Sequence, residues 1–432
     1  MSDQDFKCVK TIVWGSENAP ENCLKQWEEP FIFSELENSA LVQHHGGPCA
    51  VLAPIQAQLI QTLLLKNNNF SRTINSAADL QALMSSGTTN VSLKSCLISV
   101  LHQVLSRCTS SGPLKIVNFS EENLSVVTIN SAEKLDDAET SFDVFFQPGG
   151  VLNFVYSIIL TREAENIKAD LGLQSDPLIE SVHGHGSVAL TNLCLIGKAV
   201  PNMFDDNKDL GGLVLNGISE TPDIGYLSLM EHFRYIEVGH RMKNPKYPIW
   251  LLSSETHLTV LCSTERNLCS AGEELTVKQA FAKLDSSGNG FIQEGDLSRL
   301  LKDLQLPDDG SSLAAAKSEL DSEDLGIITL GAIMLKYFPH LLQANDFEVI
   351  TDVPFMQYNG LNFKTESNTV NISPSKSDAT SITPSYSYGV GVIGLGSQTA
   401  ADSTKLELIL ATKWPAIQIN WSVGSKPSVD WI

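Results

Sequence analysis

The chain has 432 residues, of which 42% are hydrophobic and 18% charged, as is typical of a globular protein with a sizeable core. Its formal net charge of -21 disfavours nucleic acid and anionic membrane surfaces as partners, because an acidic surface repels both. The apolar stretch 51–65 is too short to span a bilayer and contains Gln and Pro, so we expect a core helix there and no membrane segment. The acidic N-terminus does not have the pattern of a signal peptide.

Eight cysteines are scattered along the chain, and none stands in the CxxC pairs that are typical of zinc frameworks. Several lie in apolar runs, where a buried free thiol is the simplest interpretation. This usage favours a reducing compartment, either the cytoplasm or the nucleus. A cysteine that lies near a histidine in such a compartment is a candidate nucleophile.

The periodicity of the apolar residues predicts an α+β fold. Helical spacing occurs in three segments, 48–66, 92–108 and 149–171. Runs of β-branched and apolar residues predict strands at 248–254, at 257–263, at 347–360 and twice within 405–421, where Pro415 is near the junction.

The composition divides the chain into three parts. Residues 1–272 form the first part of a main domain, residues 273–343 read as a helix–loop–helix pair, and residues 344–432 return to the main domain. Because strands are predicted on both sides of the helical insert, we expect it to interrupt a single sheet. Residues 362–403 are rich in Ser, Thr, Asn and Gly, and we expect a mobile loop there.

The segment LVQHHGGPCAVLAPIQ contains a candidate nucleophile, Cys49. Two glycines permit an unusual turn, and Pro48 is favourable at a helix start, so Cys49 is predicted in the first turn of a helix. The unpaired amides and the dipole there favour a thiolate and can bind an oxyanion. Pro54 requires either a later helix start or a distorted first turn. The alternative is a buried structural cysteine.

Gln43 precedes Cys49 by six residues, and a side-chain amide at that distance can reach a developing oxyanion. The alternative is a solvated loop residue. His44 and His45 are also close to Cys49 and are possible bases, although adjacent loop histidines are more often exposed.

His257 lies between two predicted strands and is a second candidate base. Activation of a thiol requires a neutral imidazole within hydrogen-bond reach of the sulfur. A cysteine at a helix start followed by a histidine on a later strand is the order found in papain-type enzymes. A lone strand histidine is more often structural. Glu255 would share a strand face with His257, where it either contacts substrate or faces solvent.

With these residues in place, the sequence resembles the MINDY family of deubiquitinases, and most of all the subgroup with an EF-hand-like insertion. The long segments SALVQHHGGPCAVLAPIQA and HGHGSVALTNLCLIGKAVPNMFDD carry much of this resemblance. The matching stretches run from near the start of the chain to its end: 13–23, 32–57, 159–171, 183–206, 224–260 and 412–421.

The resemblance implies a papain-like cysteine protease variant that cleaves isopeptide bonds in polyubiquitin, with a preference for lysine-48 linkages. By position, Cys49 matches the nucleophile, His257 the base and Gln43 the oxyanion-hole glutamine. No cofactor is required, and the expected partners are polyubiquitin and ubiquitinated proteins. The residue that orients the histidine stays open; Asn359 and Asn420 lie on plausible strands and are candidates.

Five further residues are candidates for the groove that would take the glycine-rich tail of ubiquitin. Each has an alternative role in turns, in core packing or at the surface. They are Gly184, Gly186, Phe204, Tyr226 and Glu255.

Residues 285–296 have the layout of an EF-hand loop, and residues 321–332 have a second, degenerate one. The candidate calcium ligands of the first loop are Asp285, Ser287, Asn289, Phe291 and Asp296. Asp296 replaces the usual bidentate glutamate, so we predict weak calcium binding at most. The second loop has Leu325 and Ala332 where ligands are needed, which favours a structural pair.

Three alternatives to an active deubiquitinase follow from these features. They are an inactive ubiquitin-binding protein, a calcium-responsive adaptor and a cysteine protease for another substrate. Retention of Gln43, Cys49 and His257 together argues against the inactive protein.

Overall fold

The computed structural model describes residues 3–35, 37–66, 78–79, 82, 93–119, 124–130, 139–173, 176–269, 277–278, 280–281, 284–285, 289–304, 306–321, 325–339, 350–360, 386–393, 403–414, 417–422 and 427–429.

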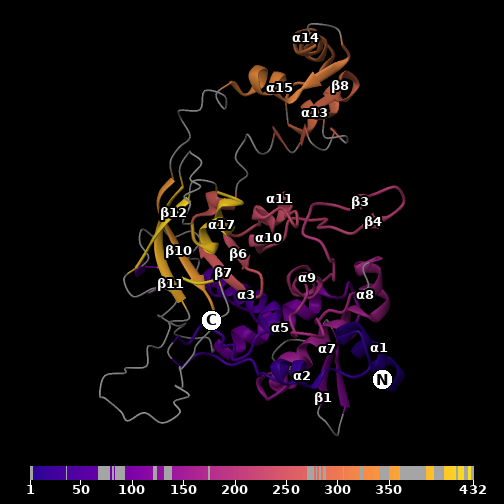
Figure 1. Ribbon diagram of the computed structural model, residues 1–432, viewed down its shortest axis with the longest axis vertical. Coiled ribbons are helices and arrows are strands. Elements are labelled where there is room, and N and C mark those ends of the chain that lie inside the picture. The colour runs from indigo at the N-terminus through magenta and orange to yellow at the C-terminus, as the bar shows by residue number, and fades with distance from the viewer. Residues whose placement is uncertain are drawn as a thin grey trace. The chain divides into compact units, whose positions relative to one another are not determined.

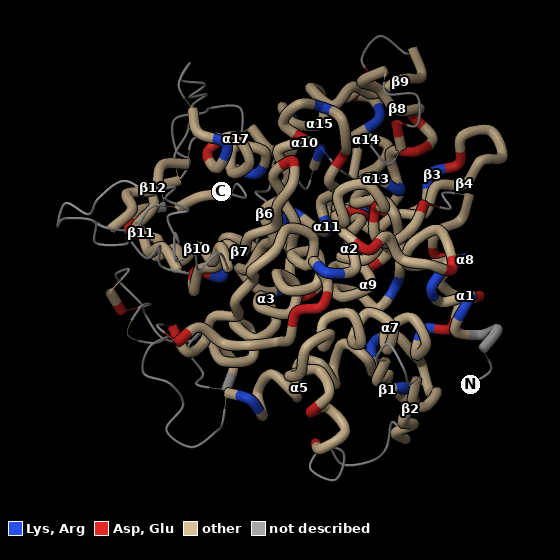
Figure 2. Tube along the Cα trace, turned by 60° about the horizontal axis from the view of Figure 1, so that its bottom comes forward, with Lys and Arg blue, Asp and Glu red and all other residues tan. Residues whose placement is uncertain are grey.

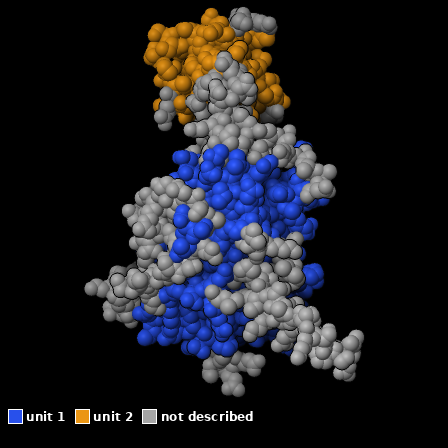
Figure 3. Space-filling view, turned by 90° about the vertical axis from the view of Figure 1, so that its left-hand side faces the viewer, with its two compact units in different colours: residues 1–269, 350–432 blue, residues 270–349 orange. Residues whose placement is uncertain are grey.

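The chain folds as two compact units, which Figure 3 shows in different colours. The first unit comprises residues 1–269 and 350–432, and the second comprises residues 270–349. The sequence predicts the two boundaries within a few residues of these positions, after residue 272 and before residue 344. The second unit is therefore an insertion in the chain of the first.

The first unit is built around a six-stranded sheet with the strand order β12-β11-β10-β7-β6-β5 (Figure 1). Its strands are β5 (Gly225–Ser228), β6 (Ile249–Ser253), β7 (Leu258–Ser263), β10 (Ile350–Tyr358), β11 (Tyr386–Ile393) and β12 (Ile417–Trp421). β5 and β6 are parallel, and the other neighbouring pairs are antiparallel. β10 follows the insertion and pairs with β7, which precedes it, so both halves of the first unit share one sheet.

The remaining elements of the first unit are mostly helices. The longer ones are α1 (Asp3–Trp14), α2 (Glu21–Trp27), α3 (Cys49–Lys66), α5 (Leu93–Arg107), η2 (Glu139–Phe146), α7 (Gly150–Arg162), α8 (Ala164–Leu171), α9 (Val188–Ile196) and α17 (Lys405–Ala411). The short ones are α10 (Leu229–His232), α11 (His240–Lys243) and η3 (Arg266–Cys269). Two hairpins complete the unit: β1 (Leu114–Phe119) with β2 (Leu124–Ile129), and β3 (Lys208–Asp209) with β4 (Val214–Leu215). None of the helices that the structure describes is long and apolar enough to cross a membrane.

α3 is the central helix of this unit. It packs on β6 and β7 and contacts α5, α7 and α9. Every residue from Cys49 to Gln61 is buried, and the helix has no charged residue before Lys66, as the tan trace of Figure 2 shows. A largely apolar helix without charges that is buried on all sides belongs in a core. It starts at Cys49 and runs on through Pro54, so the later start considered from the sequence is not needed.

The prediction of two strands within 405–421 is wrong for the first half, which forms α17. The Thr404 side chain accepts the backbone N–H of Glu407, and the Glu407 carboxylate accepts the backbone N–H of Thr404. This reciprocal cap favours a helix start. The side chains that α17 buries also have helical spacing: Leu406, Ile409 and Leu410. The second half, β12, is a strand.

The prediction of a loop over 362–403 is wrong for β11, and most of the rest of that stretch lies outside the described residues. β11 contains glycines because neighbouring side chains lie over it. A Cβ at Gly391 would come within 2.5 Å of Cε2 of Phe355, and one at Gly389 within 2.7 Å of Cγ2 of Ile419. A glycine-rich strand of this kind has the composition of a loop.

The second unit contains two similar loops followed by short strands. Its elements are β8 (Phe291–Gln293), η4 (Glu294–Asp296), α13 (Leu297–Asp303), α14 (Gly310–Leu320), β9 (Ile327–Thr329) and α15 (Leu330–Tyr337). β8 and β9 pair antiparallel, with Ile292 opposite Ile328. In each loop an aspartate, Asp285 or Asp321, accepts the backbone N–H groups of the residues four and five positions later.

Candidate active site

The turn before α3 holds Cys49 in place. The Pro48 carbonyl accepts two backbone N–H groups of the first helical turn. Gly47 has φ +114°, and a Cβ there would lie 2.4 Å from the carbonyl oxygen of Gly184, so no other residue fits without a shift. The Trp27 indole N–H donates to the same Gly184 carbonyl at 2.8 Å. Packing as well as sequence therefore fixes where the helix starts.

Gln43 is buried in the loop before this turn, with 3% of its surface exposed. Its backbone N–H donates to the Gly360 carbonyl at 3.0 Å, and its side-chain Nε2 donates to the His45 carbonyl at 2.7 Å. The loop is also tied to the sheet by the Tyr358 hydroxyl, which donates to the Leu41 carbonyl at 2.6 Å. Gln43 is thus held from both its backbone and its side chain.

His257 lies at the turn between β6 and β7 and is almost fully buried. Its Nε2 is 2.9 Å from Oδ1 of Asn359 and 3.1 Å from the Asn359 carbonyl oxygen. Because both of these oxygens can only accept, we infer that Nε2 carries the proton in the neutral ring. Nδ1 is then the basic nitrogen of His257.

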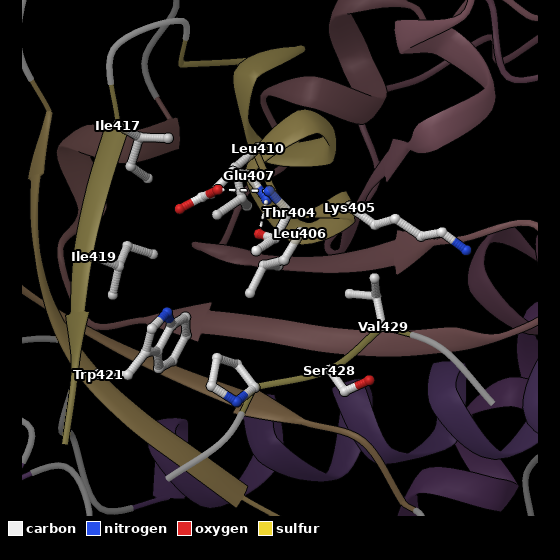
Figure 4. Close-up of a pocket in the computed structure, with 11 residues that line it drawn as sticks. Thr404, Lys405, Leu406, Glu407, Leu410, Ile417, Ile419, Trp421, Ser428 and Val429 are labelled. Atoms are coloured by element: carbon white, nitrogen blue, oxygen red, sulfur yellow. Dashed lines mark hydrogen bonds between the residues drawn. The ribbon is translucent and has the colours of Figure 1, made fainter. Parts of the chain in front are cut away.

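Asn359 is itself oriented by the C-terminal segment. Its Nδ2 donates to the Ser428 carbonyl at 3.0 Å, and Gln357 Nε2 donates to the same oxygen at 2.5 Å. The amide group therefore presents Oδ1 and not Nδ2 to His257. Figure 4 shows Ser428 and Val429 at a cavity of about 190 Å³ between α17, β12 and this segment. Neither Cys49 nor His257 lines that cavity.

Cys49 and His257 line a different cavity, of about 220 Å³. The helix start contributes Cys49 to its lining, and the β6–β7 turn contributes His257 and Leu258. Other side chains at this cavity come from α10 and the loop after it, including Met230 and Ile236. The fold thus brings the predicted nucleophile and the predicted base to one hollow.

The thiol of Cys49 is 6% exposed, and burial raises its pKa above the ordinary value. Hydrogen bonds from the Leu258 backbone and the Gln43 side chain act in the opposite direction, as do the backbones of Gly47 and Ala50. The sequence predicts that the helix start favours a thiolate, and these contacts act that way. Burial outweighs them in the free protein.

The two loop histidines do not line the cavity of Cys49. The His45 ring nitrogen Nδ1 lies 2.8 Å from Oε1 of Glu29, and the backbone N–H of His44 donates to the same oxygen at 2.9 Å. Both residues are thus engaged by Glu29. His257 is accordingly the base candidate that the geometry favours.

The two candidates for the orienting residue are placed differently. Asn359 contacts His257 directly. Asn420 lies exposed on β12, and the strands β11 and β10 separate it from β7. The structure therefore removes Asn420 from consideration.

Three of the five groove candidates line the cavity of Cys49: Gly186, Tyr226 and Glu255. Burial raises the pKa of Tyr226 to about 12, so its hydroxyl stays protonated. Gly184 does not line the cavity, because its carbonyl supports the turn of Gly47 and Trp27. Phe204 does not either, since it is buried beneath Lys208, whose Nζ lies 4.3 Å from the ring centroid.

Several residues that build the site carry no recognisable sequence signal. Tyr358, Gly360 and Ser428 act through one or two hydrogen bonds to distant segments. Glu29 stands in an ordinary-looking stretch, WEEPFIF, and nothing in its spacing relates it to Cys49. The pairing of β10 with β7 would be needed to relate Tyr358 and Gly360 to the site.

The family model for the conserved domain of the deubiquitinating enzyme MINDY-3/4 matches residues 10–281. The chain belongs to this family of deubiquitinating enzymes. Its members are cysteine-type hydrolases, in agreement with a cavity lined by a cysteine and a histidine.

Curated relatives extend the match to the whole chain. The chain is 33% identical to the ubiquitin carboxyl-terminal hydrolase MINDY-3 of Danio rerio, with all of both chains covered. It is 32% identical to MINDY-3 of Homo sapiens over 98% of this chain and 99% of that protein. The probable ubiquitin carboxyl-terminal hydrolase MINDY-4 of Homo sapiens is 31% identical over 61% of this chain and 36% of its own. No solved structure matches the chain.

Proposed function

We propose that this protein hydrolyses the isopeptide bonds of lysine-48-linked polyubiquitin with Cys49 as nucleophile and His257 as base. The observation that carries the proposal is one cavity that is lined by both Cys49, at a helix start, and His257, which is braced by Asn359. The lysine-48 preference and the partners, polyubiquitin and ubiquitinated proteins, rest on the family resemblance. A papain-like arrangement agrees with the order of the elements that carry the two residues.

In the proposed mechanism Nδ1 of His257 takes the proton from the Cys49 thiol, and the sulfur attacks the carbonyl of ubiquitin's C-terminal glycine. The oxyanion accepts hydrogen bonds from the Gln43 side chain and the Cys49 backbone N–H. The imidazolium then protonates the departing lysine amine, which leaves a thioester on Cys49. A water activated by the same imidazole hydrolyses the thioester and restores the free thiol.

Burial of the thiol gives His257 a specific task. Because the raised pKa of Cys49 leaves little thiolate at neutral pH, attack requires transfer of the proton to a base within reach. Asn359 serves this transfer by holding the ring with Nε2 protonated. Gln43 and the Leu258 backbone N–H then stabilise the sulfur once it is charged.

The test is cleavage of lysine-48-linked tetraubiquitin by the wild-type protein and by Cys49→Ala, with lysine-63-linked tetraubiquitin in parallel. We expect the wild type to release shorter chains from the lysine-48 substrate and the variant to release none. Equal cleavage by both proteins would refute the assignment of Cys49. Equal cleavage of both linkages by the wild type would refute the linkage preference alone.

A ubiquitin probe with an electrophilic C-terminus separates the inactive binding protein from the enzyme. An adduct on Cys49 under reducing conditions supports the enzyme, whereas binding without an adduct supports the alternative. A cysteine protease for another substrate would leave both ubiquitin substrates intact.

We also propose that the second unit is an EF-hand-like pair with a structural role. The β8–β9 pairing and the two aspartate-held loops support this interpretation. Of the candidate ligands, Ser287 lies outside the described residues, and Asp285, Asn289, Phe291 and Asp296 lie in or beside the first loop. We propose that any calcium binding is weak, because Asp296 stands where an EF-hand loop has a bidentate glutamate. We place the protein in the cytoplasm or the nucleus on the basis of its cysteine usage.

A further inference from the structure

Glu29 is a buried charged group beside the site that the mechanism above does not use. Its side chain is 4% exposed. One carboxylate oxygen, Oε1, accepts the backbone N–H of His44 at 2.9 Å and the backbone N–H of His45 at 2.6 Å. The same oxygen lies 2.8 Å from the His45 ring nitrogen Nδ1. Three donors from two consecutive residues therefore converge on one atom.

These contacts are concentrated on the loop that carries Gln43. The other carboxylate oxygen, Oε2, is buried and has no hydrogen-bond partner within the described part of the chain. Burying a carboxylate is costly unless its hydrogen bonds compensate for the lost water. All the side-chain hydrogen bonds that the structure gives Glu29 go to His44 and His45, so its effect is exerted there.

The loop transmits this constraint to the oxyanion site. The His45 carbonyl accepts one N–H of the Gln43 amide at 2.7 Å. An amide NH₂ group has two protons in one plane, so fixing the first fixes the direction of the second. Hydrogen bonding by the Gln43 side chain also lowers the pKa of the Cys49 thiol, which indicates that this side chain lies next to the sulfur.

We propose that Glu29 is a positioning residue of this active site: its carboxylate holds the His44–His45 peptide, and the His45 carbonyl thereby aims the Gln43 amide at the reacting carbonyl. The inference rests on the proposed function. Glu29 does not line the cavity of Cys49, and in this proposal it acts through Gln43.

A double-mutant cycle tests this dependence, with kcat and KM measured on lysine-48-linked tetraubiquitin. We expect Gln43→Ala to lower kcat by roughly 10²–10³, as does loss of an oxyanion donor elsewhere. Glu29→Ala is expected to lower kcat by roughly tenfold to a hundredfold, with little change in KM. The reason is that the Gln43 amide would no longer point at the developing oxyanion. When Gln43 is already alanine, Glu29→Ala is expected to cost less than about threefold. Independent, multiplying losses would overturn the proposal.

Two variants separate positioning from general destabilisation. Glu28→Ala changes the same residue type at the adjacent exposed position and is expected to keep wild-type kcat and melting temperature. Glu29→Gln retains an acceptor oxygen and is expected to recover most of the activity that Glu29→Ala loses. A glutamine variant as impaired as the alanine variant would contradict the role of these hydrogen bonds. The glutamine variant also keeps the test available if Glu29→Ala does not fold.

A measurement without substrate tests the contact itself. Selective ¹⁵N labelling of histidine gives amide signals from only nine residues. Amide protons that donate to a carboxylate resonate downfield, so the His44 and His45 signals are expected to move upfield in Glu29→Ala and to stay in Glu28→Ala. Unchanged signals would overturn the inference even in an active enzyme. A wild type that cleaves no ubiquitin chain would instead overturn the proposed function and leave this measurement valid.

Discussion

The two halves of the candidate active site are built in different ways. The nucleophile half is local, since Gln43 and Cys49 lie within seven residues of one another and share one loop and one helix start. The base half combines His257, Asn359 and Ser428, which come from three distant segments. The pairing of β10 with β7 brings Asn359 to His257, and the Asn359 amide joins Ser428 to them.

The difference shows what each half depends on. In the nucleophile half, a turn that admits only glycine and a buried carboxylate set the geometry. In the base half, strand register sets it: Tyr358 pairs with Val260, which places Asn359 beside the start of β7, where His257 lies. A register slip of one residue would turn the side chains of β10 to the opposite face. The base half therefore depends on the chain that returns after the second unit.

The largest expected effect in the base half comes from Asn359→Ala. It removes the side-chain acceptor of His257 Nε2 and leaves the ring with the Asn359 backbone carbonyl, at 3.1 Å. Because the ring becomes cationic during the reaction, loss of one hydrogen bond to it costs about 1.5–3 kcal/mol, which corresponds to roughly tenfold to a hundredfold in rate. We expect this loss in kcat for tetraubiquitin cleavage, with KM nearly unchanged.

Asn420→Ala is the matched control, because it removes the same side chain from an exposed position of β12. It is expected to cleave at the wild-type rate. Equal activity of the two variants would show that Asn359 has no orienting role. The base half of the site would then not depend on this contact between distant segments.

Much of the fold is readable from local patterns. The apolar spacing predicts α3 and α5, and the β-branched runs predict β6 and β7; the mixed helix-and-sheet architecture is confirmed. The predicted helix 149–171 is real but divided, since Glu163 adopts φ 72° between α7 and α8. The two wrong predictions, of a strand at α17 and of a loop at β11, arise where another feature outweighs the local composition. The capping box of Thr404 makes α17 a helix, and tertiary crowding by Phe355 makes β11 a glycine-rich strand.

The residues of the site also divide into those that a local sequence pattern identifies and those that only the tertiary structure identifies. Gln43 and Cys49 stand in one motif, so the sequence alone identifies both as candidates. His257 is one of nine histidines, and its partner could not be chosen between Asn359 and Asn420 without the strand order. Glu29 acts through hydrogen bonds to a loop, and Ser428 acts through its backbone carbonyl. Neither contact requires a particular residue pattern in the sequence. The papain-like assignment stays a prediction.

A smaller effect is expected from ending the chain after Lys426. This removes the Ser428 carbonyl that orients the Asn359 amide, while Asn359 itself remains. The net contribution of one hydrogen bond is about 0.5–1.5 kcal/mol, so kcat is expected to fall by roughly twofold to tenfold. In the Asn359→Ala background the same truncation should leave kcat unchanged, because its effect passes through that side chain.

Val429→Ala in the full-length chain is the control for this truncation. It removes buried apolar surface from the same segment but keeps the Ser428 carbonyl. We expect a lower melting temperature and a wild-type kcat. A truncated protein that cleaves at the full rate, or a Val429→Ala variant that loses as much kcat as the truncation, would show that the segment contributes only stability.

The smallest expected effect concerns the nucleophile half and is measured first on the wild-type protein. Burial raises the pKa of Cys49, so its thiolate fraction at neutral pH is smaller than that of an ordinary thiol. Iodoacetamide labelling of Cys49, followed by peptide mass spectrometry across pH 6–10, should therefore still be rising where free cysteine, with a pKa of about 8.5, has levelled off. Gln43→Ala should move the midpoint further up, because it removes a hydrogen bond that stabilises the charged sulfur. A midpoint below that of free cysteine would mean that the helix amides and His257 together outweigh burial, and that the nucleophile half is already charged before substrate arrives.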